Sequence, residues 1–223
     1  SSGRVPSHTV ITALPAAGVG ADGTAVDLSP SQIARGRRRS GGSAVRWVLA
    51  RGVLLPFADG TFDQVLDTFG DNLDAPITER ALGEMARVVR PGGVFGFTYW
   101  TREGFNRDWA ELEHRFLTGG GDGSSSPSLS TEPTARAAVA PLGDQVEILR
   151  LSLAVMWSSA DAFTDALIAQ DPYLHDLHPQ LSPTGWAGFT GELRGLVHKW
   201  NDQATEGLRL EFPYLRVVVK TAA

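Results

Sequence analysis

The chain has 223 residues, 42% of them hydrophobic and 20% charged, with a net charge of −5 at pH 7. This length and composition exclude a mostly disordered chain and predict one globular domain. Because 20 Lys+Arg residues face 25 Asp+Glu residues without a strong basic stripe, a nucleic-acid partner is disfavoured and a small-molecule partner is expected.

The absence of cysteine excludes disulfides, thiolate zinc sites and cysteine nucleophiles. No apolar run approaches the roughly 20 residues that a membrane span needs, and no basic-then-apolar signal opens the chain. We therefore expect a soluble, cytoplasmic protein with no membrane partner.

The first 100 residues alternate helical and strand patterns, which is typical of a parallel sheet covered by helices. Strands are expected at 24–28, 45–49, 62–68 and 94–99. Helices are expected at 8–18, from Pro30 onward with Ser29 as its cap, and over 77–89 before Pro91-Gly92-Gly93. The helix after Pro30 carries four arginines, which a cation-favouring helix end explains more simply than a phosphate or RNA site.

The second half is organised around a Gly, Ser and Pro-rich stretch near residues 119–133, interpreted as a flexible connection. Beyond it we expect a strand at 145–155, helices over 160–200 with a break at His178-Pro179, and a closing strand pair over 208–220. The whole chain, 1–223, is expected to be one domain. Its parts are a nucleotide-binding-type core (8–118), the connection (119–135), and C-terminal strands with a helical lid (136–223).

Three motifs occur in a defined order: Val26-Asp27-Leu28-Ser29-Pro30, then Leu55-Pro56-Phe57, then Arg87-Val88-Val89-Arg90-Pro91-Gly92-Gly93. Together they resemble the class I S-adenosylmethionine-dependent methyltransferases, in the branch that acts on small molecules. The resemblance implies a doubly wound, Rossmann-like α/β fold with a helical lid, and a ligand at the carboxyl ends of the strands. It also implies that Asp27 holds the ribose hydroxyls of the cofactor.

The glycine-rich cofactor loop of that family departs from its pattern here. Gly18-x-Gly20-x-x-Gly23 lies too close to Asp27, because a helix must separate the loop from the acid. The loop is expected instead near Gly3, where one glycine stands beside an arginine and a proline. Residues 1–8 also resemble the spacer of a purification tag, in which case the loop is missing. Either interpretation leaves the first, central strand absent, so we expect two unpaired sheet edges and further residues upstream.

A second departure concerns the adenine site. The family usually places Gly-Asp-Ala after the third strand, where this chain has Ala50-Arg51-Gly52. Arg51 has only donors and cannot accept a hydrogen bond from the adenine amino group. Such a loss lowers affinity by about one to two decades. S-adenosylmethionine is thus implied by the resemblance, while Arg51 and the loop argue against it.

Candidate catalytic and substrate-binding residues follow the strand ends. Asp71 is the candidate general base and Asn72 a substrate-binding residue, although both can simply cap the next helix. Tyr99 and Trp100 are candidates for stacking on a substrate, with core packing as the alternative.

The expected lid contributes three more candidates. His175 and His178 are potential acids or bases, and Tyr173 is a candidate substrate contact, against the alternative of a solvated helix end. No metal site is expected, because no His/Asp/Glu grouping has ligand spacing.

Three functions remain open. The one narrowly favoured is a methyltransferase-fold enzyme of natural-product metabolism with an impaired cofactor site, catalysing a cofactor-independent cyclisation or rearrangement of a small apolar metabolite. The alternatives are an S-adenosylmethionine-dependent small-molecule methyltransferase and a non-catalytic partner subunit. A homodimer is one option for its assembly.

Overall fold

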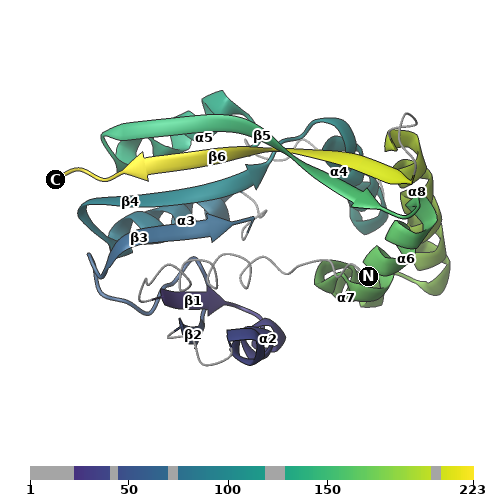
Figure 1. The fold of residues 1–223 in the computed structure, drawn as a ribbon, viewed down its shortest axis with the longest axis horizontal. Coiled ribbons are helices and arrows are strands. Elements are labelled where there is room, and N and C mark those ends of the chain that lie inside the picture. Colours follow the sequence, from purple (N-terminus) through teal and green to yellow (C-terminus); the bar gives the residue numbers. More distant parts are fainter. Residues whose placement is uncertain (1–22, 41–44, 70–74, 119–128, 202–206) are drawn as a thin grey trace. The chain divides into compact units, whose positions relative to one another are not determined.

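The structure is a computed structural model that describes residues 23–40, 45–69, 75–118, 129–201 and 207–223 (Figure 1). Its described strands are β1 (Gly23–Asp27), β2 (Val45–Leu49), β3 (Phe62–Thr68), β4 (Val89–Trp100), β5 (Gln145–Trp157) and β6 (Leu208–Lys220). Its described helices are α2 (Pro30–Ser40), α3 (Ala75–Val88), α4 (Gly104–Thr118), α5 (Glu132–Val139), α6 (Ala160–Gln170), α7 (Pro172–Leu177) and α8 (Pro183–Trp200), with short 3-10 turns at Ala140–Leu142 and His178–Gln180. None of these helices is both long and apolar enough to cross a membrane.

The strands form two sheets. β1 and β2 pair in parallel, with Asp27 opposite Leu49, and β3, β4, β6 and β5 form a four-stranded sheet in that order. β3 and β4 are parallel, whereas the arrow of β6 runs the other way in Figure 1. This mixed α/β arrangement confirms the expected Rossmann-like fold class. Within the described chain, β1 and β3 are not paired with each other.

The contacts of the chain define two compact units. The sheet unit comprises described parts of residues 6–99, 126–150 and 215–223, and the helical unit comprises those of 100–125 and 151–214. The chain therefore passes between the units at the end of β4, between Tyr99 and Trp100, and inside β5 and β6.

Each unit has its own apolar core. In the sheet unit, α3, α5 and the strands bury side chains such as Phe95, Val139 and Val217, which are fully enclosed. A smaller cluster joins α2 to β1 and β2 through Ile33 and Trp47. In the helical unit, α4, α6, α7 and α8 bury a second set around Phe189 and Leu193. These separate cores explain why the contacts fall into two groups.

Three local expectations were wrong. Residues 208–220 form one strand rather than a pair, because no turn interrupts them and the carbonyl of Pro213 accepts the backbone N–H of Thr101. Val89 opens β4 instead of ending the helix, and Pro91-Gly92-Gly93 lies inside that strand, where the pairing register shifts and Gly92 has a φ of 70°.

The expected flexible connection is also shorter than 119–135. α5 begins at Glu132 after a capping box made by Thr131 and Thr134, and Leu129 is buried in the sheet-unit core. The predicted helix at 8–18 lies outside the described residues.

Candidate functional site

The carboxyl end of β1 holds a fixed carboxylate. Oδ1 of Asp27 accepts the backbone N–H of Ser29 at 2.8 Å, and the carbonyl of Asp27 accepts the N–H of Ala50 at 3.1 Å. α2 begins immediately afterwards at Pro30, as predicted, but the Ser29 hydroxyl lies against that of Ser31 rather than on a helix N–H. The acid is thus held at the end of the parallel pair, where open α/β sheets bind ligands.

Two exposed leucines flank this carboxylate. Leu28 is 60% exposed and Leu49, the register partner of Asp27, is 55% exposed. An ionised carboxylate accepts hydrogen bonds from hydroxyl groups, and adjacent uncovered aliphatic side chains offer contact to a flat apolar ring. Sequence reasoning missed both leucines, because an apolar residue at the end of a strand gives no sign of whether it is exposed.

Arg51 lies just beyond β2 at the same end of the two-stranded sheet. It is exposed and forms an isolated antiparallel bridge with Leu54, whose N–H donates to the Arg51 carbonyl at 3.0 Å. The structure therefore places Asp27 and Arg51 at the same end of the two-stranded sheet. At that end the Arg51 side chain supplies donors only.

A salt-bridged clamp fixes the loop that follows Arg51. Glu84 on α3 accepts the N–H of Leu55 at 2.7 Å and pairs with Arg87 at 2.6 Å, while Arg87 also donates to the carbonyl of Phe57 and to Asp59. The hydrogen bond from Arg87 lowers the pKa of Glu84, against the opposing effect of partial burial. The clamp joins the second sequence motif, Leu55-Pro56-Phe57, to the third, which begins at Arg87.

A small cavity of about 10 Å³ lies at the carboxyl ends of β3 and β4. Asp67, Thr78, Thr98 and Tyr99 supply its polar lining, and Leu82, Met85, Phe97 and Leu129 are among its apolar residues. This volume holds about one water molecule. The polar groups nevertheless place a carboxylate and three hydroxyls at the strand ends where a ligand is expected.

Backbone strain marks the same place. Phe69, directly after β3, has a φ of 56°, and its N–H donates to the Thr98 hydroxyl at 3.0 Å. A bulky residue rarely adopts this left-handed conformation, and such outliers cluster at functional sites. Sequence periodicity contains no signal for it.

The other predicted residues have mixed outcomes. Gly3, Asp71 and Asn72 lie outside the described residues, as does the side chain of Tyr173 in α7. Tyr99 is buried and lines the cavity. Trp100 belongs to the helical unit, where its ring lies 5.9 Å from Phe212 and 6.1 Å from Tyr214.

The two histidines that were expected in a lid, His175 and His178, are both exposed in the helical unit but have different neighbours. The ring of His175 approaches the carbonyl of Ala169 at 3.1 Å, and the ring of His178 stacks on Trp186 with centroids 4.4 Å apart. Neither has a carboxylate partner within the part of the chain that the structure describes.

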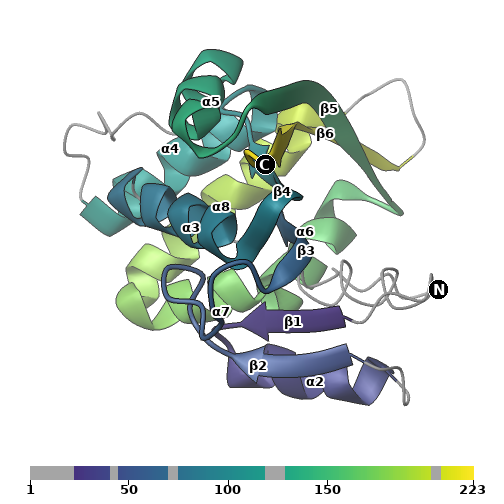
Figure 2. The same ribbon diagram turned by 90° about the vertical axis from the view of Figure 1, so that its left-hand side faces the viewer.

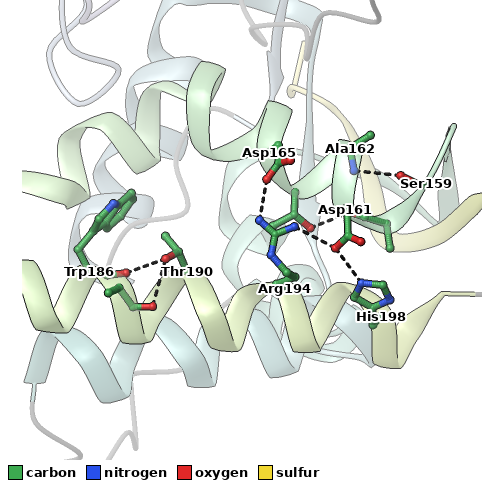
Figure 3. A network of polar contacts seen from close by, with 11 residues as sticks. Ser159, Asp161, Ala162, Asp165, Trp186, Thr190, Arg194 and His198 are labelled. Carbon is green, nitrogen blue, oxygen red and sulfur yellow. Dashed lines mark hydrogen bonds and ion pairs between the residues drawn. The ribbon is translucent and has the colours of Figure 1, made fainter.

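A polar network that contains His198 cross-links α6 and α8 (Figure 3). Asp161 accepts from both Arg194 and His198, and Asp165 accepts from Arg194. These bonds lower the pKa of Asp161, with the His198 bond contributing most. Among the described residues, no three His, Cys, Asp or Glu side chains are grouped closely enough to hold a metal ion.

Comparisons with known proteins show what parts of the chain are similar to. Residues 9–93 match the family model described as a methyltransferase domain. An uncharacterised protein of Mycobacterium bovis is 42% identical over 94 residues, covering 41% of this chain and 34% of that protein. The ubiquinone/menaquinone biosynthesis C-methyltransferase UbiE of Roseobacter denitrificans is 41% identical over 75 residues, covering 31% of this chain and 29% of that protein. The match thus spans about a third of the length of these curated relatives.

Among solved structures, the [4+2]-cyclase SpnF aligns with 97% of this chain and 73% of its own, at a TM-score of 0.55 and 20% identity. The likeness in structure extends over nearly the whole chain, whereas the family model matches residues 9–93. The chain therefore has the fold of the class I S-adenosylmethionine-dependent methyltransferases, and its residues 9–93 match a methyltransferase domain.

Proposed function

We propose that the protein transfers a methyl group from S-adenosylmethionine to a small, apolar acceptor. The observation that carries this proposal is the edge formed by Asp27, Leu28 and Leu49, which pairs a fixed carboxylate with exposed aliphatic surface. The match to a methyltransferase domain and the similarity to a C-methyltransferase support it.

The residues at this edge fit the adenosine part of the cofactor in two respects. Asp27 would accept the ribose hydroxyls, and the leucines would contact the faces of the adenine ring. When bound, the cofactor supplies a methyl group on a positively charged sulfur. Arg51 offers no acceptor to the adenine amino group, so we expect binding weaker by about one to two decades than with an acceptor there.

The acceptor would be held at the carboxyl ends of β3 and β4. Leu82, Met85 and Phe97 supply apolar contacts, and Asp67 with the Thr98 hydroxyl supplies polar groups that orient an acceptor or take its proton. Asp71, Asn72, Tyr99 and Tyr173 remain proposed acceptor contacts. His175 and His178 remain proposed acids or bases.

A second candidate is cofactor-independent cyclisation or rearrangement of an apolar metabolite. Arg51 is the observation that favours it, because a donor-only side chain at the adenine position weakens the cofactor site. The cyclase SpnF, which has this fold, shows that the fold also occurs in an enzyme named for another reaction. Such a reaction would depend on shape and positioning.

Calorimetric titration with S-adenosylmethionine and S-adenosylhomocysteine separates the two. We expect binding in the micromolar range, a loss of about tenfold or more in Asp27→Asn, and a gain of about tenfold in Arg51→Asp. Asp63→Asn, which removes an exposed carboxylate on β3, is the matched control and should bind like the wild type. Absence of binding at millimolar ligand by a folded protein would reject methyl transfer and favour the cofactor-independent reaction.

A further inference from the structure

An arginine surface, defined here as Arg35, Arg37, Arg38, Arg39, Arg46 and Arg51, surrounds β2 and α2. None of its members has a carboxylate partner within the described chain, although Arg37 donates to the Trp47 carbonyl at 3.2 Å. Elsewhere arginines are commonly paired, as Arg216 is with Glu147. Unpaired cations in this number point to an anionic partner outside the chain.

The charge of the chain is strongly uneven. Residues 23–51 contain the six arginines and one acid, Asp27, for a net charge of +5 in a chain of −5, so the remainder carries −10. Salt at physiological strength screens charges beyond about 8 Å. A partner at the arginine surface therefore experiences mainly positive charge, despite the acidic total.

The helix dipole explains only part of this surface. Arg37, Arg38 and Arg39 lie in the last turn of α2, where cations are favoured. Arg46 lies in β2 between the buried Val45 and Trp47, so it extends from the strand face opposite α2. Figure 2 shows α2 alongside β2. The arginines thus lie on α2, on the face of β2 opposite α2 and, in the case of Arg51, just beyond the strand.

An exposed apolar side chain, Leu54, lies beside Arg51. Leu54, which bridges Arg51, is 74% exposed, whereas Trp47, the aromatic residue of this segment, is buried. Phosphodiester backbones offer nothing to an exposed leucine, and a surface without exposed aromatic rings lacks the stacking platform that single strands prefer. A lipid interface provides both anionic headgroups and an apolar layer.

We propose that the arginine surface and Leu54 bind the protein peripherally to anionic lipid bilayers. This inference does not depend on the methyl-transfer proposal, and it replaces the expectation of no membrane partner. Bilayers also dissolve apolar metabolites, so attachment would place the protein where such acceptors accumulate.

Vesicle flotation of the full chain tests the proposal, with vesicles of phosphatidylcholine alone or with 30% phosphatidylglycerol. We expect binding only to the anionic vesicles and its loss at 0.5 M NaCl. Arg38→Gln with Arg46→Gln should weaken binding about 30-fold, and Leu54→Ser about tenfold. The matched control, Arg136→Gln with Arg216→Gln, removes the same charge from paired arginines and should change binding little.

Three outcomes would overturn the proposal. They are equal affinity for neutral vesicles, an equal loss in the control variant, and tight binding to duplex DNA without binding to anionic vesicles. Circular dichroism establishes that each variant is folded. Because Leu54→Ser changes no charge, it tests the apolar contact with the bilayer separately from the electrostatic attraction.

Discussion

Asp108 on α4 offers the sharpest test of how the helical unit is stabilised. Its side chain is only 11% exposed, and its Oδ2 accepts from Lys199 Nζ at 2.6 Å and from Trp200 Nε1 at 2.8 Å, both on the last turn of α8. The hydrogen bond from Lys199, with those from Trp200 and Arg107, lowers the pKa of Asp108 from 3.8 to about 2.

The pKa shift fixes the sign and size of the effect. Because the folded-state pKa lies below the unfolded-state value, the ionised carboxylate stabilises the fold above pH 4. That stabilisation disappears as the pH falls through about 2. A shift from 3.8 to about 2 corresponds to about 2 kcal/mol at pH 7, of which about half remains at pH 3.

We therefore expect Asp108→Asn to lower the free energy of unfolding by about 2 kcal/mol at pH 7 and by about half of that at pH 3. Urea unfolding, followed by tryptophan fluorescence at both pH values, measures this difference. Asp63→Asn, in an exposed pair with Arg90, is the matched control and should lose less than about 1 kcal/mol. A loss that is the same at both pH values, or no larger than the control's, would refute the electrostatic explanation.

Two further predictions concern the sheet unit. A Cβ on Gly36 would overlap the indole of Trp47, so Gly36→Ala should lower the free energy of unfolding by about 1–3 kcal/mol. In contrast, a Cβ on Gly83 in α3 would have no heavy atom within 4 Å, so Gly83→Ala should raise the free energy of unfolding by about 0.5–1 kcal/mol. Thermal unfolding compares the two variants, and equal effects would contradict this description of the packing. Glu84→Ala should cost about 1.5–3 kcal/mol in urea unfolding, because it frees the N–H of Leu55 and unpairs Arg87, and an unchanged midpoint would show that the clamp is dispensable.

The sequence predicted some elements of the fold better than others, because their boundaries are marked by different kinds of residues. β3 was predicted with its observed bounds because turn residues and polar positions delimit it, and α2 begins at Pro30 because that residue suits the first helical turn. The pair of strands expected over residues 208–220 was wrong, because the chain continues extended through Pro213 as the single strand β6. Local sequence does not show which backbone groups a distant segment will satisfy.

In the candidate site, only the residues that belong to a recognisable sequence motif could be proposed from the sequence. Asp27 and Arg51 came from ordered motifs and lie together at one sheet edge. Leu28 and Leu49 were missed because an apolar residue at a strand end is normally buried, and only the folded structure shows that these are not. Tertiary contacts, not composition, decide exposure at such positions.

The left-handed Phe69 has a consequence for any effort to stabilise this protein. Glycine at this position would relieve a backbone conformation that disfavours a bulky side chain by roughly 1–2 kcal/mol. The Phe69 side chain is half-buried, so the same substitution would also remove its packing, and the two effects oppose each other. The melting temperature of Phe69→Gly would therefore report the difference between the backbone relief and the lost packing, rather than the backbone strain by itself.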